Sequence, residues 1–212
     1  MGLTKAQILQ WLSNCAQYFN ENKEYLTELD REIGDADHGL NMQRGFAGVM
    51  AKLPTVADKD IGSILKTTGM TLLSQVGGAS GPLFGTFFIK GAQSVAGKES
   101  LSFREVFQML KDGVDGIVTR GRAEIGDKTM CDVWIPTIAS LEIAGCSDTS
   151  ASLAQALTTA VQRAEECLAG TIPMKAKKGR ASYLNERSIG HQDPGATSAV
   201  YILRALLDSV EK

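Results

Sequence analysis

The sequence predicts an all-α protein, a single-domain antiparallel up-and-down barrel of about eight helices. Apolar residues recur along most of the chain at spacings of three and four, which is the period of an amphipathic helix. Three segments open with a Ser or Thr followed three residues later by Gln or Glu, the signature of a capping box. No segment alternates apolar and polar residues convincingly as a strand would. Most connections are short, so consecutive helices should run antiparallel.

Eight apolar stripes define the expected helices. In chain order they cover 8–19, 42–53, 61–76, 82–95, 106–118, 131–144, 153–168 and 203–210. The first, fifth and seventh stripes follow capping boxes that begin at Thr4, Ser102 and Ser152. The last follows Asp193 as the expected N-cap and Pro194 at the first helical position. No stretch between the stripes has the length or composition of an interdomain linker, so one domain is expected over residues 1–212.

Composition restricts the class of protein. With 43% hydrophobic and 22% charged residues, the chain suits a globular domain with its own core. The net charge of −2 argues against nucleic-acid binding, which usually requires a basic face. No apolar run is long enough to span a membrane, and the first residues do not resemble a signal peptide. The four cysteines show no Cys-x-x-Cys spacing, so a reducing, cytoplasmic location is expected.

Four stretches interrupt the helical pattern: Leu29–Asn41, Gly77–Pro82, Gly121–Met130 and Gly170–Asp193. They fall between helices one and two, three and four, five and six, and seven and eight. In an up-and-down bundle, alternate connections emerge at the same end, so all four should meet there. Four irregular, polar connections at one end of a bundle indicate a functional site.

The first of these stretches contains the acidic residues Asp30, Asp35 and Asp37. Repulsion among close carboxylates is costly unless a cation neutralises them, and three Asp side chains with open coordination positions suit Mg²⁺ shared with phosphate oxygens. A calcium loop of the EF-hand type is excluded because Phe46 stands where its Glu ligand is required. Glu32 should lie outside the cluster, since it alternates away from the other side chains. The alternative is a solvated acidic turn in which Asp37 caps the second helix.

The second and fourth stretches have features of an anion site. In Gly77–Pro82, small residues would let backbone N–H groups approach a phosphate at a helix N-terminus, although a tight turn explains them equally well. The long stretch Gly170–Asp193 is basic, and its Arg180 could clamp a phosphate beside the acidic cluster. The alternative is a solvated basic loop. His38 and His191 both lie in the irregular stretches, which favours a polar role for each.

Taken together, these motifs are similar to those of a known family. The chain resembles the nucleotide-binding L subunit of bacterial dihydroxyacetone kinase, in the form that depends on the phosphotransferase system. The resemblance covers essentially the whole chain, less closely over residues 142–159. It rests on the segments 29–42, 77–86, 126–130, 179–183 and 190–196.

The resemblance implies a fold, a cofactor and a set of site residues. It implies an eight-helix antiparallel barrel that holds ADP, cycling with ATP, at one end. It further implies two Mg²⁺ ions on the equivalents of Asp30, Asp35 and Asp37. The implied nucleotide contacts are His38, Gly39, Leu40, Asn41, Ala79, Ser80, Gly121, Met130, Arg180, Asp193, Pro194 and Gly195. No catalytic acid, base or nucleophile is assigned.

The resemblance also implies partners. In one group of relatives the L domain is fused behind a substrate-binding domain and uses free ATP. In the other it is a separate chain whose bound ADP is phosphorylated by a phosphohistidine on the M subunit, and the γ-phosphoryl then passes to dihydroxyacetone on the K subunit. A chain of this length leaves no room for a substrate domain, which favours the second group. A contact with a transcriptional regulator is a further expectation.

Two alternatives remain open at this point. One is a kinase subunit of the same fold that uses free ATP. The other is an interaction module that binds nucleotide only to signal its presence. Retention of nucleotide through purification would separate the first alternative from the expected function, and absence of phosphoryl transfer in a reconstituted system would favour the second.

Overall fold

The computed structural model describes residues 2–146 and 152–211, which are mostly helical. The α-helices are α1 (Lys5–Glu21), α2 (Lys23–Ile33), α3 (His38–Lys52), α4 (Ile61–Gln75), α5 (Ser80–Ser94), α6 (Phe103–Gly121), α7 (Cys131–Cys146), α8 (Leu153–Gly170) and α9 (Pro194–Glu211). Two 3-10 segments, η1 (Leu53–Thr55) and η2 (Arg180–Ser188), and two short strands, β1 (Leu3–Thr4) and β2 (Ser100–Leu101), complete the described structure.

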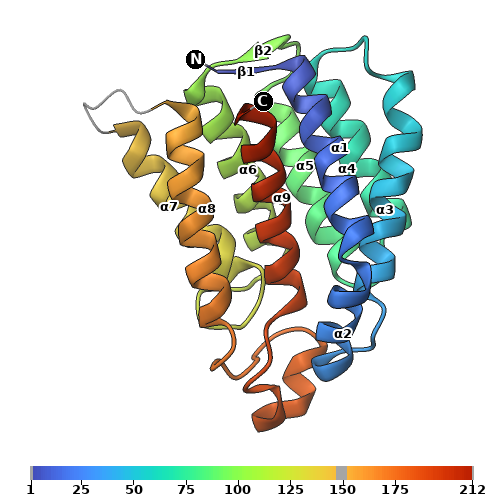
Figure 1. Ribbon diagram of the computed structural model, residues 1–212, viewed down its shortest axis with the longest axis vertical. Helices are drawn as coiled ribbons and strands as arrows, with labels where there is room; N and C mark the ends of the chain where they lie inside the picture. The colour runs from blue at the N-terminus through green and yellow to red at the C-terminus, as the bar shows by residue number, and fades with distance from the viewer. Residues whose placement is uncertain (1, 147–151, 212) are drawn as a thin grey trace.

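Eight long helices form a closed ring (Figure 1). Apart from α2, each helix has 15 to 19 residues and packs against its neighbours in the chain. The last helix, α9, packs against both α8 and α1 and so closes the ring. The predicted all-α, eight-helix antiparallel barrel is therefore confirmed.

One helix, two short strands and the two 3-10 segments were not predicted. The 11-residue helix α2 follows α1 after the single residue Asn22 and occupies part of what the sequence pattern marked as an irregular stretch. The strands β1 and β2 pair antiparallel, with Leu3 opposite Leu101. This corrects the expectation of no strand: two residues are too few for an alternating pattern to be visible in the sequence.

Contacts between the first and last helices fix the closure of the ring. The indole N–H of Trp11 donates to the carbonyl oxygen of Ile202 over 2.9 Å, and the Asn14 amide donates to that of Ala205 over 3.0 Å. On its other side α1 packs against α3, where the rings of Phe19 and Phe46 stack with centroids 4.9 Å apart. Buried polar groups that find partners orient a helix, while apolar packing supplies most of the stability.

Four helices begin at the capping residues that the sequence predicts. Complete capping boxes are present at Thr4, Ser102 and Ser152. Helix α9 begins at Pro194, and a carboxylate oxygen of Asp193 accepts a hydrogen bond from the third residue of that helix over 2.7 Å. These caps satisfy N–H groups that have no partner within their own helices.

The irregular connections gather at one end of the barrel, the lower end in Figure 1. The first is shorter than predicted, because α2 continues to Ile33 and α3 begins at His38. The fourth spans 171–193 and contains η2, which is interrupted at Asn185 by a left-handed φ of 52°. We call residues 171–193 the strap.

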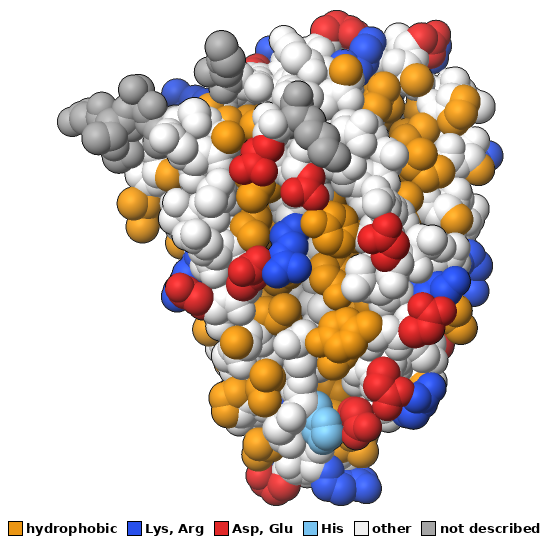
Figure 2. All heavy atoms as spheres, viewed as in Figure 1, with side chains coloured by type: hydrophobic (Ala, Val, Ile, Leu, Met, Phe, Trp, Pro, Cys, Tyr) orange, Lys and Arg blue, Asp and Glu red, His pale blue; other side chains and the backbone are white. Residues whose placement is uncertain are grey.

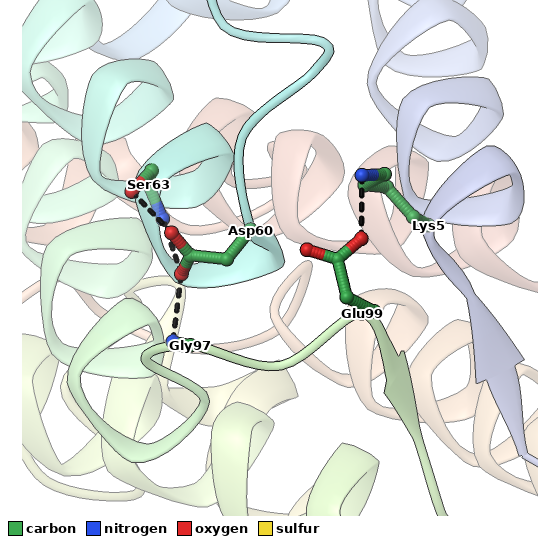
Figure 3. Close-up of polar contacts among 5 residues, drawn as sticks. All are labelled: Lys5, Asp60, Ser63, Gly97 and Glu99. Atoms are coloured by element: carbon green, nitrogen blue, oxygen red, sulfur yellow. Dashed lines mark hydrogen bonds and ion pairs between the residues drawn. The ribbon is translucent and has the colours of Figure 1, made fainter.

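The opposite end is held by a polar cluster (Figure 3). Asp60 accepts hydrogen bonds from the backbone N–H groups of Ser63, over 3.2 Å, and Gly97, over 2.8 Å. The Ser63 hydroxyl donates to the same carboxylate, and this bond is the main reason that the pKa of Asp60 is lowered. Beside it, Lys5 pairs with Glu99 at 2.5 Å. The cluster ties the start of α4 to the connection between α5 and α6.

The surface of the described residues carries mixed charge. On the face drawn in Figure 2, acidic and basic side chains are interspersed rather than separated. None of the helices in the described ranges combines the length and the hydropathy needed to cross a bilayer.

Replacing Asp60 should test the cluster at this end. Asp60→Ala removes a helix cap and the acceptor for the Gly97 N–H, so it should lower the free energy of unfolding by about 1–2 kcal/mol at pH 7. Because folding lowers the pKa of this carboxyl, its contribution is present above the unfolded pKa of about 4 and is lost as the pH falls. Urea unfolding at pH 7 and at about pH 3 should show the two proteins converging in acid.

The matched control is Asp58→Ala, a change at an exposed residue of the same connection. It should alter stability by less than about 0.5 kcal/mol. An equal loss for Asp60→Ala at both pH values would contradict the electrostatic part of this explanation.

Candidate functional site

A cavity of about 390 Å³ lies where the four connections meet. Its walls come from the end of α2, the turn that follows it, the starts of α3 and α5, the connection between α6 and α7, and the strap. Most of the site residues expected from the sequence line it: Asp30, Asp35, Asp37, His38, Asn41, Ala79, Ser80, Gly121, Met130, Arg180, Asp193, Pro194 and Gly195. The topological prediction that these segments share one end is thereby confirmed.

Gly39 and Leu40 do not line the cavity. A Cβ atom on Gly39 would lie 1.9 Å from the backbone oxygen of Lys23, so this glycine lets α3 approach α2 closely. Leu40 is 54% exposed on the outer side of α3. Their neighbours in the chain, His38 and Asn41, do line the cavity.

The three predicted aspartates come together in the way that a cation site requires. Each offers an oxygen atom within 4.8 Å of the oxygens offered by the others; Asp30 is buried, whereas Asp35 and Asp37 are exposed. The turn between α2 and α3 permits this approach. A Cβ atom on Gly34 would lie 2.0 Å from the Asp30 carboxylate, and Ala36 adopts a left-handed φ of 61°.

Asp30 rather than Asp37 caps α3. One carboxylate oxygen of Asp30 accepts hydrogen bonds from the backbone N–H groups of Asp37, over 3.0 Å, and His38, over 3.1 Å. Asp37 stands at the N-cap position, but its side chain makes no capping bond. The expectation that Asp37 caps this helix, which belonged to the alternative of a solvated acidic turn, is therefore wrong. Glu32 points elsewhere, as expected, and lies 3.7 Å from the ring of His191.

Arg180 supplies positive charge to the acidic cluster. Its guanidinium lies 3.0 Å from the carboxylate of Asp35, and its side chain is 67% exposed. An ion pair this exposed is weak, because water and salt screen it. The Arg180 side chain can therefore exchange Asp35 for another anion at little cost in free energy.

His38 is a buried part of the cavity wall. Its Nε2 atom lies 2.7 Å from the hydroxyl of Ser198, and its Nδ1 atom lies 3.1 Å from the hydroxyl of Ser80. Burial lowers the pKa of His38, although the carboxylates of Asp30 and Asp37 oppose the shift. The ring thus fixes the Ser80 hydroxyl at the start of α5. His191, which was expected to share such a role, lies outside the cavity.

Asp193 forms the floor on the α9 side. Its carboxylate is buried and accepts the N–H of Ala196. Burial raises the pKa of Asp193 to about 7, while that hydrogen bond and the charge of Lys128 act against the rise. Gly195 leaves room here, since a Cβ atom at this position would lie 3.3 Å from Asp193 and 3.5 Å from Met130.

Sequence reasoning missed three buried polar residues around the site, of which Lys128 lines the cavity itself. Asp132 accepts the backbone N–H groups of Gly126, over 2.6 Å, and Thr129, over 2.8 Å, and so shapes the connection between α6 and α7. Lys128 and Ser198 are buried at 1% and 0% exposure, respectively. A lysine in a loop and a serine on a helix have no periodic signal, so only the fold identifies their places.

Comparisons with known proteins agree with this geometry. Residues 32–208 match the DAK2 domain family. The chain is 59% identical over 206 residues to the ADP-binding subunit of PEP-dependent dihydroxyacetone kinase from Escherichia coli K12, covering 97% of both chains. It is 39% identical over 208 residues to the ADP-binding subunit of the PTS-dependent dihydroxyacetone kinase from Lactococcus lactis, covering 98% of this chain and 99% of that one.

A solved structure shares the fold. The dihydroxyacetone kinase from C. freundii in complex with AMP-PNP and Mg²⁺ superposes with a TM-score of 0.73 at 21% identity, over 99% of this chain. The chain spans about a third of that kinase, 35% of its length. At this identity the likeness concerns the fold alone.

The raised pKa of Asp193 predicts a pH dependence of stability. In protein free of nucleotide and metal, the folded state holds the Asp193 proton up to about pH 7, whereas the unfolded carboxyl releases it near pH 4. The contribution of this residue to stability should therefore fall as the pH rises from 4 to 7. Asp193→Asn keeps an acceptor for the Ala196 N–H but cannot ionise. In urea unfolding, the free energy of unfolding of Asp193→Asn relative to the parent should increase between pH 5 and 8. A constant difference over this range would contradict the raised pKa of Asp193.

Proposed function

The chain belongs to the DAK2 domain family, and we propose that it is the ADP-binding subunit of a dihydroxyacetone kinase that depends on phosphoenolpyruvate and the phosphotransferase system. In this role its bound ADP accepts a phosphoryl group from a phosphohistidine on an M subunit. The resulting ATP donates its γ-phosphoryl to dihydroxyacetone held by a K subunit. The observation that carries the proposal is the cavity in which three clustered aspartates face a basic strap.

The donor set fits magnesium. Hard oxygen ligands from two or three carboxylates, with positions left open for phosphate oxygens, are typical of Mg²⁺ in phosphoryl-transfer sites. Asp30, Asp35 and Asp37 would hold two such ions, and the exposed Asp35 and Asp37 face the open side. Magnesium bound there would neutralise phosphate charge and align the groups for in-line transfer.

The chain's own residues would bind and orient the nucleotide. Helix α5 begins at Ser80, and the preceding residues Gly78 and Ala79 line the cavity, so backbone N–H groups and the helix dipole favour an anion there. Arg180 would exchange Asp35 for a phosphate oxygen, offering a planar pair of donors. Gly121, Met130 and Gly195 leave an apolar and open surface for the rest of the nucleotide.

The phosphoryl group should reside on nucleotide rather than on this chain. His38 is buried with both ring nitrogens close to serine hydroxyls, so neither is available as a phosphoryl carrier. No group of the cavity is assigned as a general base, and activation of the acceptor hydroxyl is proposed to fall to the K subunit. A cytoplasmic location, near the supply of phosphoenolpyruvate, and contact with a transcriptional regulator complete the proposal.

The aspartate cluster can be tested by removing one charge. Asp37→Asn should keep the helical fold but weaken retention of Mg-ADP by a few kcal/mol, because it loses a charge-assisted ligand. Calorimetric titration with ADP, with and without Mg²⁺, measures the effect. Asp58→Asn, an exposed aspartate at the far end of the barrel, is the matched control. Equal Mg-ADP affinity of Asp37→Asn and the parent would rule out the three-aspartate site.

The mechanism predicts a distinctive turnover pattern. Freshly purified protein should carry about one ADP per chain, as expected of a cofactor rather than a substrate. Loaded with ATP and mixed with a K subunit, it should convert at most one dihydroxyacetone per chain. Sustained turnover should require the M subunit and its phosphoenolpyruvate-fed donors. Rapid multiple turnover from free ATP with the K subunit alone would favour the ATP-dependent alternative.

A further inference from the structure

Lys128 is a buried lysine for which the proposed reaction has no use. It follows Asp127 in the connection between α6 and α7, has a left-handed φ of 62°, and is 1% exposed. A lysine beside a nucleotide site would ordinarily be read as a phosphate ligand, since its ammonium is a mobile point charge. The contacts of its side chain indicate another role.

The ammonium group of Lys128 is fully engaged by the backbone of the strap. It donates to the carbonyl oxygens of Ile172 over 3.3 Å, Met174 over 3.0 Å and Ser188 over 2.8 Å. An ammonium has three donors, so these three acceptors use them all. No donor is left for a phosphate without breaking a bond to the strap.

These three carbonyl groups belong to the two legs of the strap. Ile172 and Met174 lie on the leg that leaves α8, and Ser188 lies on the leg that returns toward α9. The legs are also joined by the Gly190 N–H donating to Ile172 over 2.8 Å, and by the Ala176 N–H donating to the Ser188 hydroxyl over 2.9 Å. Lys128 therefore pins the base of a closed loop.

The tip of that loop carries Arg180. Between the two legs, Ala176 and Ala181 pack with Ile33 at the end of α2, directly beside the acidic cluster. Arg180 then reaches Asp35 at 3.0 Å, although its own side chain is mostly exposed. The exposed ion pair with Asp35 is weak, so the position of the guanidinium depends also on where the base of the strap is held.

We propose that Lys128 is a positioning residue that anchors the strap to the barrel and so holds Arg180 over the nucleotide cavity, without contacting phosphate itself. The inference rests on the proposed nucleotide site for its functional part. Its structural part concerns the strap in protein free of nucleotide and can be tested separately.

The first measurement is hydrogen exchange in protein without nucleotide. Lys128→Met removes all three donors, and exchange of the amides in 172–190 should accelerate by about tenfold or more, because the strap opens locally. Amides of α1 and α4 should keep their protection. Lys66→Met, an exposed lysine on α4, is the matched control and should leave the strap unchanged. Unchanged exchange in the strap of Lys128→Met would overturn the proposal.

The second measurement is a double-mutant cycle on ADP affinity. If Lys128 acts through Arg180, Lys128→Met and Arg180→Ala should each weaken binding by about tenfold, and together by little more than either alone. A direct phosphate contact by Lys128 would instead give additive losses of about a hundredfold with normal exchange in the strap, and would overturn the proposal. A parent protein that binds no ADP would refute the proposed function, while the exchange measurement would still decide the role of Lys128.

Lys128→Met leaves three carbonyl oxygens without their donor, a cost that calls for a second variant in case the protein does not fold. Lys128→Gln, which keeps two N–H donors, is the second variant. It should give exchange rates in the strap between those of the parent and Lys128→Met, and rates equal to the parent with reduced ADP affinity would contradict the anchoring role.

Discussion

The packing of α9 against α1 joins residues 191 positions apart in the chain, and the site depends on it. Trp11 and Asn14 donate to backbone oxygens of α9, so the last helix is fixed in both position and rotation. This rotation directs Ser198 to the ring of His38 and brings Asp193 to the floor of the cavity. If the ring were open, the strap and the acidic turn would have no common wall. Closure of the barrel is thus the condition for a site assembled from four separate connections.

Charge at the site is arranged in two layers with different functions. Asp35, Asp37 and Arg180 are solvent-exposed and held weakly, which allows them to exchange partners when a cation and an anion arrive. Lys128, in the cavity wall, and Asp132 are buried and bonded to the backbone, which makes them costly to disturb. A loosely held outer layer on a rigid inner layer suits a cofactor that stays bound while its terminal phosphate changes. Asp30 belongs to both layers, because one of its oxygen atoms caps α3 while the carboxylate remains within the acidic cluster.

Family membership and the site geometry support each other. The match to the E. coli subunit covers 97% of both chains, so the likeness is to a separate nucleotide-binding subunit and extends beyond a shared domain. By contrast, the chain corresponds to 32% of the human triokinase/FMN cyclase, at 34% identity. The match thus extends over the whole of one relative and over about a third of the other.

The sequence by itself determined the helical class, the order of the long helices, three capping boxes and the end of the barrel at which the site lies. Those features are local or periodic: each depends on residues three or four positions apart, or on the alternation of up and down helices. The clustering of Asp30, Asp35 and Asp37 was also predictable, because all three lie within eight residues.

Tertiary structure decided the features that a local sequence pattern does not encode. Packing between separate segments decided where α2 ends and that Asp30 caps α3. It also brought His38 to Ser198, and it bonded Lys128 to the backbone of the strap. Gly39 and Leu40 were expected in the site but do not line it. Gly39 packs against α2, and Leu40 points into solvent. A motif fixes which residues are near one another along the chain, whereas the direction in which each side chain points depends on how the helices pack in the closed barrel.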